Sequence, residues 1–493
     1  MYERSSGVLL HISSLPGQHG IGDFGSGAYE FVDFLYKAKQ KYWQVLPLGL
    51  TGYCNSPYSS FSAFAGNPYF IDLDELIKSG YLSKEDVINA GFSQENSIAY
   101  DYLYENKVSL LRQAYKNAKE EIKEDLEHFH HKHYSWIDGF SLYMSLKELY
   151  EYRSWKDWDN VHRKYHSPEV MEHKENNREE MNFWVFTQYC FYKQWFALKK
   201  YANNLGIKII GDLPIYVSKD SADVWSNPSL FHFDEELMPI TVAGNPPDAF
   251  SPTGQLWGNP IYNWDAMEKD GYKWWIYRIK QSLQFYDTLR IDHFRGFESY
   301  WEIKYGAENA MEGRWVKGPG IKLFDKIKEE LGEVDIIAED LGVSSDDVKE
   351  LLHRTGYPGM KVLQFAFDIE GDSEHLPHNY NKKTVVYTGT HDNPPVNGWL
   401  KTASDEEKAF ARKYFHQCSN EETHWAFIRG AWSSTAYLAI AQMQDFLGLD
   451  EMARMNTPST IGCNWTWRLR SEDLSTELAE KIAELTTLYR REL

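Results

Sequence analysis

The chain has 493 residues, and 52 Lys and Arg against 72 Asp and Glu give it a net charge of -20 at pH 7. Because phosphate binding depends on concentrated basic side chains, this acidic balance argues against nucleic acid as a partner. The N-terminal apolar run Val8-Leu-Leu10 is too short for a signal peptide, and no stretch approaches a membrane span, so we expect a cytoplasmic protein without a membrane partner.

Two short apolar runs near the N-terminus, residues 8–12 and 43–47, predict the first two strands of a sheet. A long stretch follows before the next strand, and within it residues 103–152 have the charged, amphipathic pattern typical of helices. We therefore predict a largely helical insertion, residues 75–205, between the second and third strands.

The second half of the chain repeats the order helix, glycine, apolar strand and polar turn, which is typical of βα units. A region rich in Pro, Gly, Asn and Trp, residues 217–285, is predicted as a loop-rich insertion between the third and fourth strands. The later strands are predicted at residues 207–210, 289–292, 336–338, 360–367, from 385 onward, and at 452–457. With the first two they number eight, which predicts an α/β fold, the (β/α)8 TIM barrel.

Four of these apolar runs end in a carboxylate or a short polar cluster. The runs are Ile209-Ile-Gly-Asp212, Leu289-Arg-Ile-Asp292-His293, Ile336-Ile-Ala-Glu339-Asp340 and Val385-Val-Tyr-Thr-Gly-Thr-His391-Asp392-Asn393. The C-terminal ends of barrel strands meet at one mouth, where barrel enzymes carry their catalytic residues. The pattern therefore indicates an enzyme with several acids in one site.

Breaking a glycosidic bond needs one carboxylate at the anomeric carbon and one carboxylic acid for the leaving oxygen. Asp292 and Glu339 are the natural pair. Arg290 stands two residues before Asp292, so on a strand both side chains share a face, and a fixed cation there favours ionised Asp292. Glu339 follows an apolar run and has acidic neighbours, which favours its protonated form. Asp392 and His391 are expected to grip sugar hydroxyls.

Aromatic residues make up 16% of the chain, and some lie in polar surroundings, as around Trp257. Flat rings with polar edges suit the faces of sugars, so carbohydrate is the leading substrate class. Two other classes of function compete with this interpretation. The pairs Asp292-His293 and His391-Asp392 have the atoms to hold a divalent metal, but Arg290 would oppose a cation, so no metal is predicted. A sugar-binding protein without catalysis would explain the aromatic residues but not the acids.

Several motifs, taken in this order, resemble glycoside hydrolase family 77, the 4-alpha-glucanotransferases called amylomaltase or disproportionating enzyme. The motifs are His11-Ile-Ser-Ser-Leu-Pro-Gly17, Gly20-Ile-Gly-Asp-Phe-Gly25, Ser56-Pro-Tyr58, Gly66-Asn-Pro-Tyr69, Gly211-Asp-Leu-Pro-Ile-Tyr-Val217, Pro246-Pro-Asp248, Trp257-Gly-Asn-Pro260, residues 289–297, Ala338-Glu-Asp-Leu-Gly342 and Thr390-His-Asp-Asn393. They span nearly the whole chain. The resemblance implies a (β/α)8 barrel with inserted subdomains and an enzyme that needs no cofactor.

The resemblance also implies roles for single residues. Asp292 would be the nucleophile, Glu339 the general acid/base and Asp392 the stabiliser of the transition state. The residues implied to contact the sugar at the cleavage point are Asp212, Arg290, His293 and His391. Those implied to line the neighbouring glucan groove are Tyr58, Asp248, Gln255 and Trp257.

The expected reaction moves a segment of an α-1,4-glucan to the 4-hydroxyl of glucose or of another glucan, with retention and through a covalent glycosyl-enzyme. The expected small-molecule partners are malto-oligosaccharides, glucans derived from starch or glycogen, and glucose. The alternative is a retaining α-glucan hydrolase that uses water as the acceptor.

Overall fold

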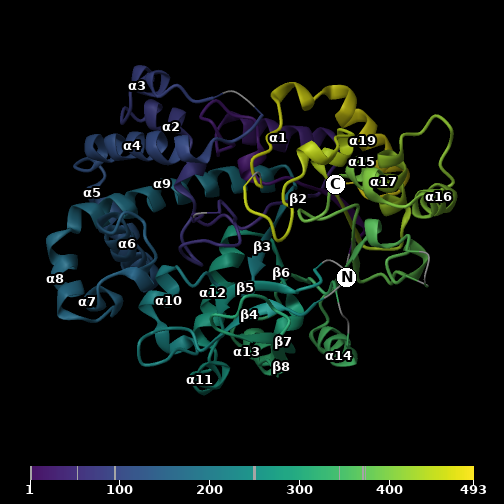
Figure 1. Cartoon of the computed structure of the whole chain (residues 1–493). Coiled ribbons are helices and arrows are strands. Elements are labelled where there is room, and N and C mark those ends of the chain that lie inside the picture. Colours follow the sequence, from purple (N-terminus) through teal and green to yellow (C-terminus); the bar gives the residue numbers. More distant parts are fainter. Residues whose placement is uncertain are drawn as a thin grey trace.

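The chain is built around a closed barrel of eight parallel strands (Figure 1). This computed structural model describes residues 3–52, 54–93, 96–247, 251–342, 345–368, 371, 373–462 and 464–492. The barrel strands are β1 (Ser5–Leu9), β2 (Tyr42–Gln44), β3 (Lys208–Pro214), β6 (Thr288–Asp292), β9 (Ile336–Ala338), β10 (Gly359–Val362), β11 (Thr384–Tyr387) and β12 (Leu438–Gln442). They pair in the order β10-β11-β12-β1-β2-β3-β6-β9, and the Ala338 N–H donates to the Pro358 carbonyl at 2.9 Å, next to β10, which closes the ring. The predicted (β/α)8 barrel is confirmed.

The barrel strands are buried on both faces, as parallel strands between a barrel interior and a helix layer must be. Every residue of β1, β11 and β12 is buried. One set of side chains fills the barrel interior and packs as a single cluster, which includes Leu9, Tyr42, Ile210, Ile337, Met360, Val362, Val385, Tyr387, Leu438 and Ile440. Alternate residues point the other way, toward the helices, and include Val8, Trp43, Ile209, Leu289, Val386 and Ala439.

The prediction of the eighth strand at residues 452–457 is wrong. The eighth strand is β12, and the predicted stretch instead begins in the short 3-10 helix η8 (Glu451–Ala453) and continues without a strand. The reason is burial: Met452 is 89% exposed, whereas a strand of this barrel has to be covered on both faces. The first strand also starts and ends earlier than predicted, and β10 ends at Val362 rather than at residue 367.

Helices fill the chain from β1 to β3. Helix α1 (Ser26–Lys37) connects β1 to β2. Between β2 and β3 lie η2 (Pro68–Phe70), α2 (Leu73–Lys78), α3 (Lys84–Asn89), α4 (Tyr100–Ala118), α5 (Lys123–Lys132), α6 (Tyr134–Leu149), η3 (Trp155–Asp157), α7 (Asn160–Arg163), α8 (Pro168–Asn176) and α9 (Arg178–Asn204). Helix α9 packs against α5, α6 and α1, and Gly206, with φ of 81°, turns the chain from its end into β3.

A second, antiparallel sheet stands beside the barrel. It pairs in the order β5-β4-β7-β8 and is made of β4 (Thr241–Asn245), β5 (Gln255–Pro260), β7 (Ser299–Lys304) and β8 (Gly313–Lys317). The same part of the chain forms α10 (Ala222–Ser226), η4 (Pro228–Leu230), α11 (Trp264–Lys269), α12 (Lys273–Phe285) and η5 (Phe294–Phe297). This sheet extends from the strands that carry the polar ends (Figure 1).

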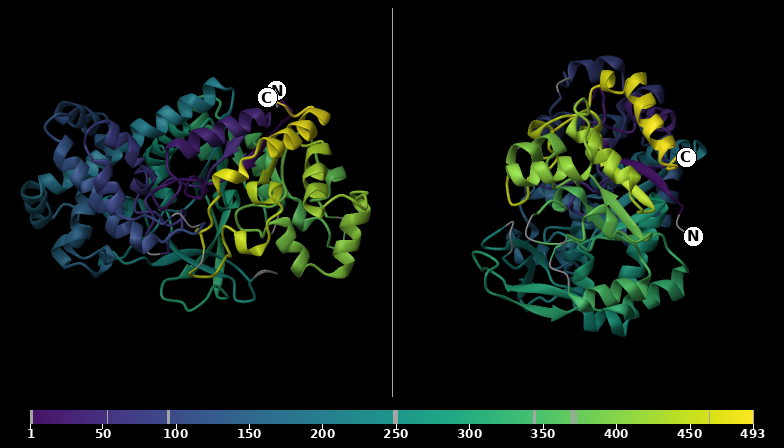
Figure 2. Two further views of the ribbon diagram at one scale, coloured as in Figure 1. Left: turned by 90° about the horizontal axis from the view of Figure 1, so that it is seen from above. Right: turned by 90° about the vertical axis from the view of Figure 1, so that its right-hand side faces the viewer.

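The C-terminal part completes the helix layer. Its elements are α13 (Ile321–Leu331), α14 (Asp346–Thr355), η6 (Leu363–Phe365), η7 (Pro377–Asn379), α15 (Val396–Thr402), α16 (Asp405–Tyr414), α17 (Thr423–Ser433), α18 (Met443–Phe446), η9 (Ser471–Asp473) and α19 (Thr476–Leu488). Helix α19 lies against α1, and the two ends of the chain come together (Figure 2). Among the described residues, no helix has both the length and the apolarity to cross a membrane.

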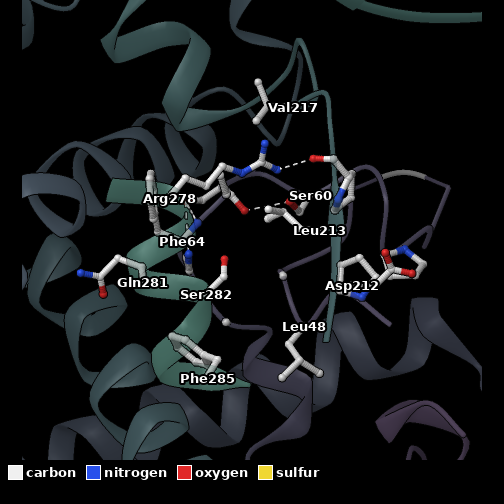
Figure 3. Close-up of a pocket in the computed structure, with 18 of the residues that line it drawn as sticks. Leu48, Ser60, Phe64, Asp212, Leu213, Val217, Arg278, Gln281, Ser282 and Phe285 are labelled. Atoms are coloured by element: carbon white, nitrogen blue, oxygen red, sulfur yellow. Dashed lines mark hydrogen bonds between the residues drawn. The ribbon is translucent and has the colours of Figure 1, made fainter. Parts of the chain in front are cut away.

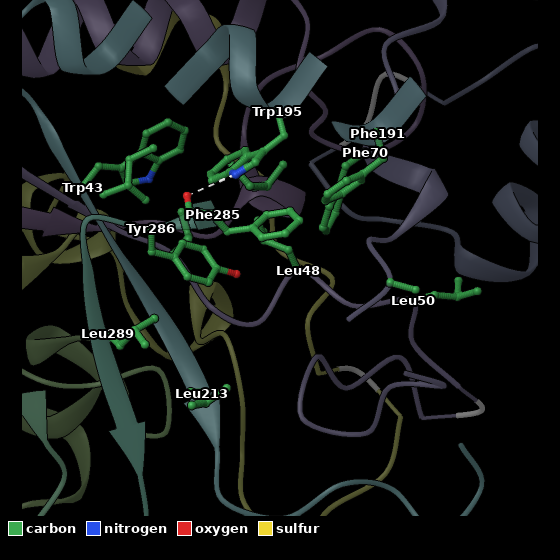
Figure 4. Close-up of a cluster of buried hydrophobic side chains, with 14 of the residues drawn as sticks. Trp43, Leu48, Leu50, Phe70, Phe191, Trp195, Leu213, Phe285, Tyr286 and Leu289 are labelled. Atoms are coloured by element: carbon green, nitrogen blue, oxygen red, sulfur yellow. Dashed lines mark hydrogen bonds between the residues drawn. The ribbon is translucent and has the colours of Figure 1, made fainter. Parts of the chain in front are cut away.

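Large aromatic side chains join α9 and α12 to the barrel (Figure 4). The Trp195 indole N–H donates to the Phe285 carbonyl at 3.2 Å, and Tyr286 lies against β3. Gly211 permits this approach, because a Cβ atom there would lie 2.1 Å from the Tyr286 ring. The residue before Asp212 therefore has to be glycine for this packing to place β3.

Candidate active site

The polar strand ends meet at one mouth of the barrel. In the register of the sheet Asp212 is level with Arg290, and Ile291 is level with Ala338. Side chains alternate along a strand, so Asp212, Arg290, Asp292 and Glu339 all lie on the inward face. Three neighbouring strands thus deliver three acids and one cation to the same place.

Arg290 is the centre of this group. Its guanidinium is 4% exposed and donates to both carboxylate oxygens of Asp212, at 2.6 and 2.8 Å. The other end of the fork lies 3.1 Å from Oδ1 of Asp292. Burial alone would lower the pKa of Arg290, but Asp212 and Asp292 outweigh it and raise the pKa, so the guanidinium stays charged. Asp292 has a fixed cation at its side and remains 30% exposed toward the mouth.

Glu339 lies beside this ion pair in a different electrostatic state. Its carboxylate accepts hydrogen bonds from the backbone N–H groups of His293 and Leu341, both at 2.7 Å. Burial raises the pKa of Glu339 to about 8, with a further contribution from Asp292, although Arg290 and the two backbone donors oppose the shift. At neutral pH Glu339 therefore holds a proton that it can donate.

Tyr58 and His391 close one side of the mouth. The Tyr58 hydroxyl donates to Asp212 Oδ2 at 2.7 Å and lies 3.3 Å from His391 Nδ1. The two rings stack with centroids 4.9 Å apart. Trp465 stands 6.0 Å from each of them, so three flat rings border the acids.

Asp392 is more exposed than Asp212, Asp292 and Glu339. Its side chain is 47% exposed, with Oδ2 3.5 Å from His391 Nε2. Its other carboxylate oxygen accepts a hydrogen bond from the Asn456 amide at 2.6 Å, and its backbone carbonyl accepts one from Arg454 at 2.6 Å. A segment far along the chain thus reaches the end of β11.

His293 and Trp257 form the opposite side. His293 adopts a left-handed conformation, with φ of 53°, directly after β6. Its ring stands perpendicular to the Trp257 ring, with the two ring centroids 4.8 Å apart. Burial, and to a lesser extent Arg295, lower the pKa of His293 to about 3, so its imidazole is neutral. Trp257 is 38% exposed and its indole N–H donates to Gln255 Oε1 at 3.1 Å. Asp248, predicted to line the groove, lies outside the described residues.

A cavity adjoins Asp212 on the side of β3 that faces α12 (Figure 3). Its lining includes Ser60, Phe64, Gln281, Ser282 and Phe285. At its edge the buried Arg278 donates to the carbonyls of Pro214 at 2.7 Å and Ile215 at 3.0 Å. Arg278 thereby anchors the end of β3 from behind, which fixes the strand that carries Asp212.

One group of the described residues has the geometry to hold a metal ion, and it lies away from the strand ends. His19, Asp23 and Asp72 are all buried, with candidate ligand atoms within 4.8 Å of one another. The Lys107 ammonium is fully buried 3.6 Å from Asp23 and already supplies positive charge there. This arrangement is an internal ion-pair cluster, because a divalent cation would meet a neighbouring ammonium.

Sequence reasoning missed several residues of the mouth. His11 follows β1 as the acids follow their strands, is buried, and accepts a hydrogen bond from the Leu46 N–H at 3.2 Å; the same strand-end pattern would have found it. Asn456 and Arg454 fell within the wrongly predicted eighth strand. Trp465 has no signal of its own in the sequence, because only the fold brings it to Tyr58.

Comparisons with known proteins place the whole chain in one family. A family model described as 4-alpha-glucanotransferase matches residues 10–475. A 4-alpha-glucanotransferase of Clostridium butyricum is 51% identical over 485 residues, which cover 98% of this chain and 100% of the relative. The solved structure of an amylomaltase from Streptococcus agalactiae in complex with acarbose is 44% identical, with a TM-score of 0.97 and complete coverage of both chains.

A more distant amylomaltase structure, from Corynebacterium glutamicum, shares the fold at 18% identity and a TM-score of 0.81, over 98% of this chain and 75% of that one. The family match spans most of the sequence, and the first relatives are covered over nearly their full length. The chain therefore belongs to the 4-alpha-glucanotransferases of glycoside hydrolase family 77.

Proposed function

We propose that this 4-alpha-glucanotransferase works by a retaining double displacement in which Asp292 is the nucleophile and Glu339 the general acid/base. The observation that carries the proposal is the contrast between the two carboxyls. Asp292 lies 3.1 Å from the Arg290 cation, while burial raises the pKa of Glu339 to about 8. One acid is held ready to attack and the other ready to give a proton.

In the first step an Asp292 oxygen forms a bond to the anomeric carbon of an α-1,4-glucan, the glycosidic bond breaks, and the Glu339 proton passes to the departing 4-oxygen. In the second step the 4-hydroxyl of glucose or of another glucan gives its proton to the Glu339 carboxylate and attacks the glycosyl-Asp292 ester, which releases Asp292. Two inversions give net retention. Asp392 stabilises the transition state.

The substrates we propose are malto-oligosaccharides, glucans derived from starch or glycogen, and glucose. The complex of the Streptococcus agalactiae amylomaltase with acarbose, an oligosaccharide analogue, supports this class. Asp212, Arg290, His293 and His391 would contact the sugar at the cleavage point, and Tyr58, Asp248, Gln255 and Trp257 would line the groove. We propose a cytoplasmic enzyme in which residues 75–205 and 217–285 are insertions that shape this groove.

The test is the substitution Asp292→Asn with maltotriose as substrate. The unsubstituted enzyme should form longer oligosaccharides together with glucose, and Asp292→Asn should form none while still binding maltotriose. The matched control is Asp335→Asn, which changes an exposed acid at the opposite end of β9 and should leave kcat unchanged. An active Asp292→Asn enzyme would overturn the nucleophile assignment, and glucose and maltose without longer products would show water as the acceptor.

A further inference from the structure

We infer that Asn456 and Arg454 are positioning residues that hold Asp392 in the orientation it needs for the reaction. The inference rests on the proposed role of Asp392 and assigns a supporting role to the segment that contains Arg454 and Asn456. Both residues lie directly after η8, in the stretch that follows the last barrel strand. They donate hydrogen bonds to Asp392 and not to the proposed nucleophile or acid/base.

Asn456 and Arg454 form a bracket of three hydrogen bonds around Asp392, which lies in the loop after β11. Asn456 Nδ2 donates to Asp392 Oδ1 at 2.6 Å, and Arg454 Nη2 donates to the Asp392 carbonyl at 2.6 Å. Arg454 Nε also donates to the Asn456 carbonyl at 2.7 Å. The arginine thus fixes the backbone of both partners of the side-chain hydrogen bond. Oδ2 of Asp392 is left facing His391 Nε2 at 3.5 Å and the open mouth.

The bracket itself is anchored in the barrel. Met455 is 3% exposed and packs in the interior cluster, and its carbonyl accepts the Trp465 N–H at 2.7 Å. Glu451 pairs with Arg454 at 3.0 Å from the preceding turn. The segment from η8 to Asn456 is therefore held by the packing of Met455 in the barrel interior and by the ion pair between Glu451 and Arg454.

Asp392 needs such a bracket more than Asp292 does. Among the described residues, no lysine or arginine side chain lies within 4.0 Å of the Asp392 carboxylate, while Asp292 has the buried Arg290. A half-exposed carboxylate without a fixed cation is free to change rotamer, and catalytic groups have to stay within fractions of an ångström of the productive geometry. Asn456 supplies the direction that a cation would otherwise impose.

The first experiment measures kcat and KM of Asn456→Ala on maltotriose. Because the contact orients a group that acts in the transition state, kcat should fall on the order of 10- to 100-fold while KM changes little. Asn464→Ala is the matched control. The Asn464 side chain accepts the Thr457 N–H at 3.0 Å and so orders the same segment, but it does not touch Asp392 in the structure. Its kcat should stay within a few-fold of the unsubstituted enzyme.

A second variant, Asn456→Asp, tests the pH dependence of kcat, which a purely structural role of Asn456 would leave unchanged. Asn456→Asp keeps the shape but places a carboxyl 2.6 Å from Asp392, where two negative charges repel and one shared proton is favoured. Its kcat, relative to that of the unsubstituted enzyme, should therefore rise on the acidic side of the pH profile and fall as pH increases. This variant also serves if Asn456→Ala fails to fold.

Three outcomes would overturn the inference, and they have different consequences. Normal kcat in Asn456→Ala, or a pH profile of Asn456→Asp parallel to that of the unsubstituted enzyme, would remove the positioning role alone. Full activity of Asp392→Asn would remove the proposed role of Asp392 and the inference together. A large loss in Asp392→Asn with the predicted effects at Asn456 supports both.

Discussion

Two buried arginines stand at opposite ends of the barrel, and they are satisfied in different ways. Arg290, at the mouth, faces carboxylates: two hydrogen bonds to Asp212 and an ion pair with Asp292. Arg491, at the base, is fully buried, and its partners among the described residues are all backbone carbonyls, those of Trp432, Ser5, Tyr437, Ala436, Ser434 and Ala431.

The difference separates catalysis from stability. Carboxylates raise the pKa of Arg290, and the cation in return holds Asp292 and Asp212 in place. Carbonyls carry no net charge, so burial, with Arg4 nearby, lowers the pKa of Arg491. Arg491 joins the C-terminal segment to the starts of β1 and β12, and it forms no ion pair with a carboxylate of the described residues. We infer that Arg290, paired with carboxylates, acts on the charge and position of site residues, whereas Arg491, paired with carbonyls, acts on the stability of the fold.

The largest effect is expected from Arg290→Met. Loss of the cation leaves the buried Asp212 with the Tyr58 hydroxyl as its remaining side-chain donor and removes the guanidinium that stands beside Asp292, so neither carboxylate is held in place as before. We expect kcat on maltotriose to fall by about 1000-fold, comparable to the loss of a transition-state donor. Steady-state kinetics on the folded fraction, identified by gel filtration and circular dichroism, measures this.

Arg290→Lys sharpens the same test. Lysine keeps the charge but not the planar fork that reaches two carboxylates at once, so its kcat should lie between those of Arg290→Met and the unsubstituted enzyme. Equal activity of Arg290→Met and the unsubstituted enzyme would show that the cation is dispensable and would break the comparison.

The second effect is expected from Arg491→Met and should appear in stability. Six carbonyls lose their donor, and the free energy of unfolding should fall by on the order of 3 kcal/mol. Denaturant unfolding measures this, and kcat per folded molecule should stay unchanged because the mouth of the barrel is not touched. A fall in kcat without a loss of stability would contradict the division between the two ends.

The fold was largely predictable from sequence because burial and glycine positions determine it. The strands that carry Asp212 and Asp292, and the strand that Glu339 follows, have apolar runs next to an acid, and that signal located all three. β12 was missed because its run, Leu438-Ala-Ile-Ala-Gln442, is short and two of its five residues are alanine, which is uncommon in strands. In residues 452–457 the polar side chains of Arg454, Asn456 and Thr457 already weaken the strand pattern, and the structure shows Met452 exposed.

The mouth was partly predictable for a related reason. Arg290 and Asp292 share a face by strand spacing alone, and their contact at 3.1 Å agrees with that. The hydrogen bond from Tyr58 to Asp212 joins residues far apart in sequence and had no local signal other than family resemblance. The contact of Asn456 with Asp392 had none at all, because it depends on how one loop folds back.

The third effect concerns pH and the state of Glu339. Its pKa is raised from the ordinary 4.5 to about 8 because burial outweighs the Arg290 cation. As a general acid it must be protonated, so kcat should fall above about pH 8, with a limiting slope of about tenfold per pH unit. A pH profile of maltotriose disproportionation measures this.

The same shift affects stability with a definite sign. The folded protein keeps the Glu339 proton that the unfolded chain releases near pH 4.5, so this stabilising contribution is complete below 4.5 and is lost as pH rises toward about 8. Glu339→Gln removes this contribution, and the difference between its unfolding free energy and that of the unsubstituted enzyme should change over this window. A flat difference would mean that Glu339 is ionised throughout.

The smallest effect is expected from Tyr58→Phe, which keeps the stacking on His391 and deletes one hydroxyl. Asp212 loses the hydrogen bond at 2.7 Å but keeps both bonds to Arg290, so kcat/KM should fall only about fivefold, equivalent to about 1 kcal/mol. Tyr201→Phe is the matched control, because its hydroxyl donates to the Asp33 carboxylate at 2.6 Å between α9 and α1, outside the barrel, and should not affect kcat. If Tyr58→Phe were as damaging as Arg290→Met, the Tyr58 hydroxyl would matter as much as the Arg290 cation for holding Asp212. The contrast between the two ends of the barrel would then lie in the whole hydrogen-bond network around Asp212, and not in the carboxylate or carbonyl partners of a single arginine.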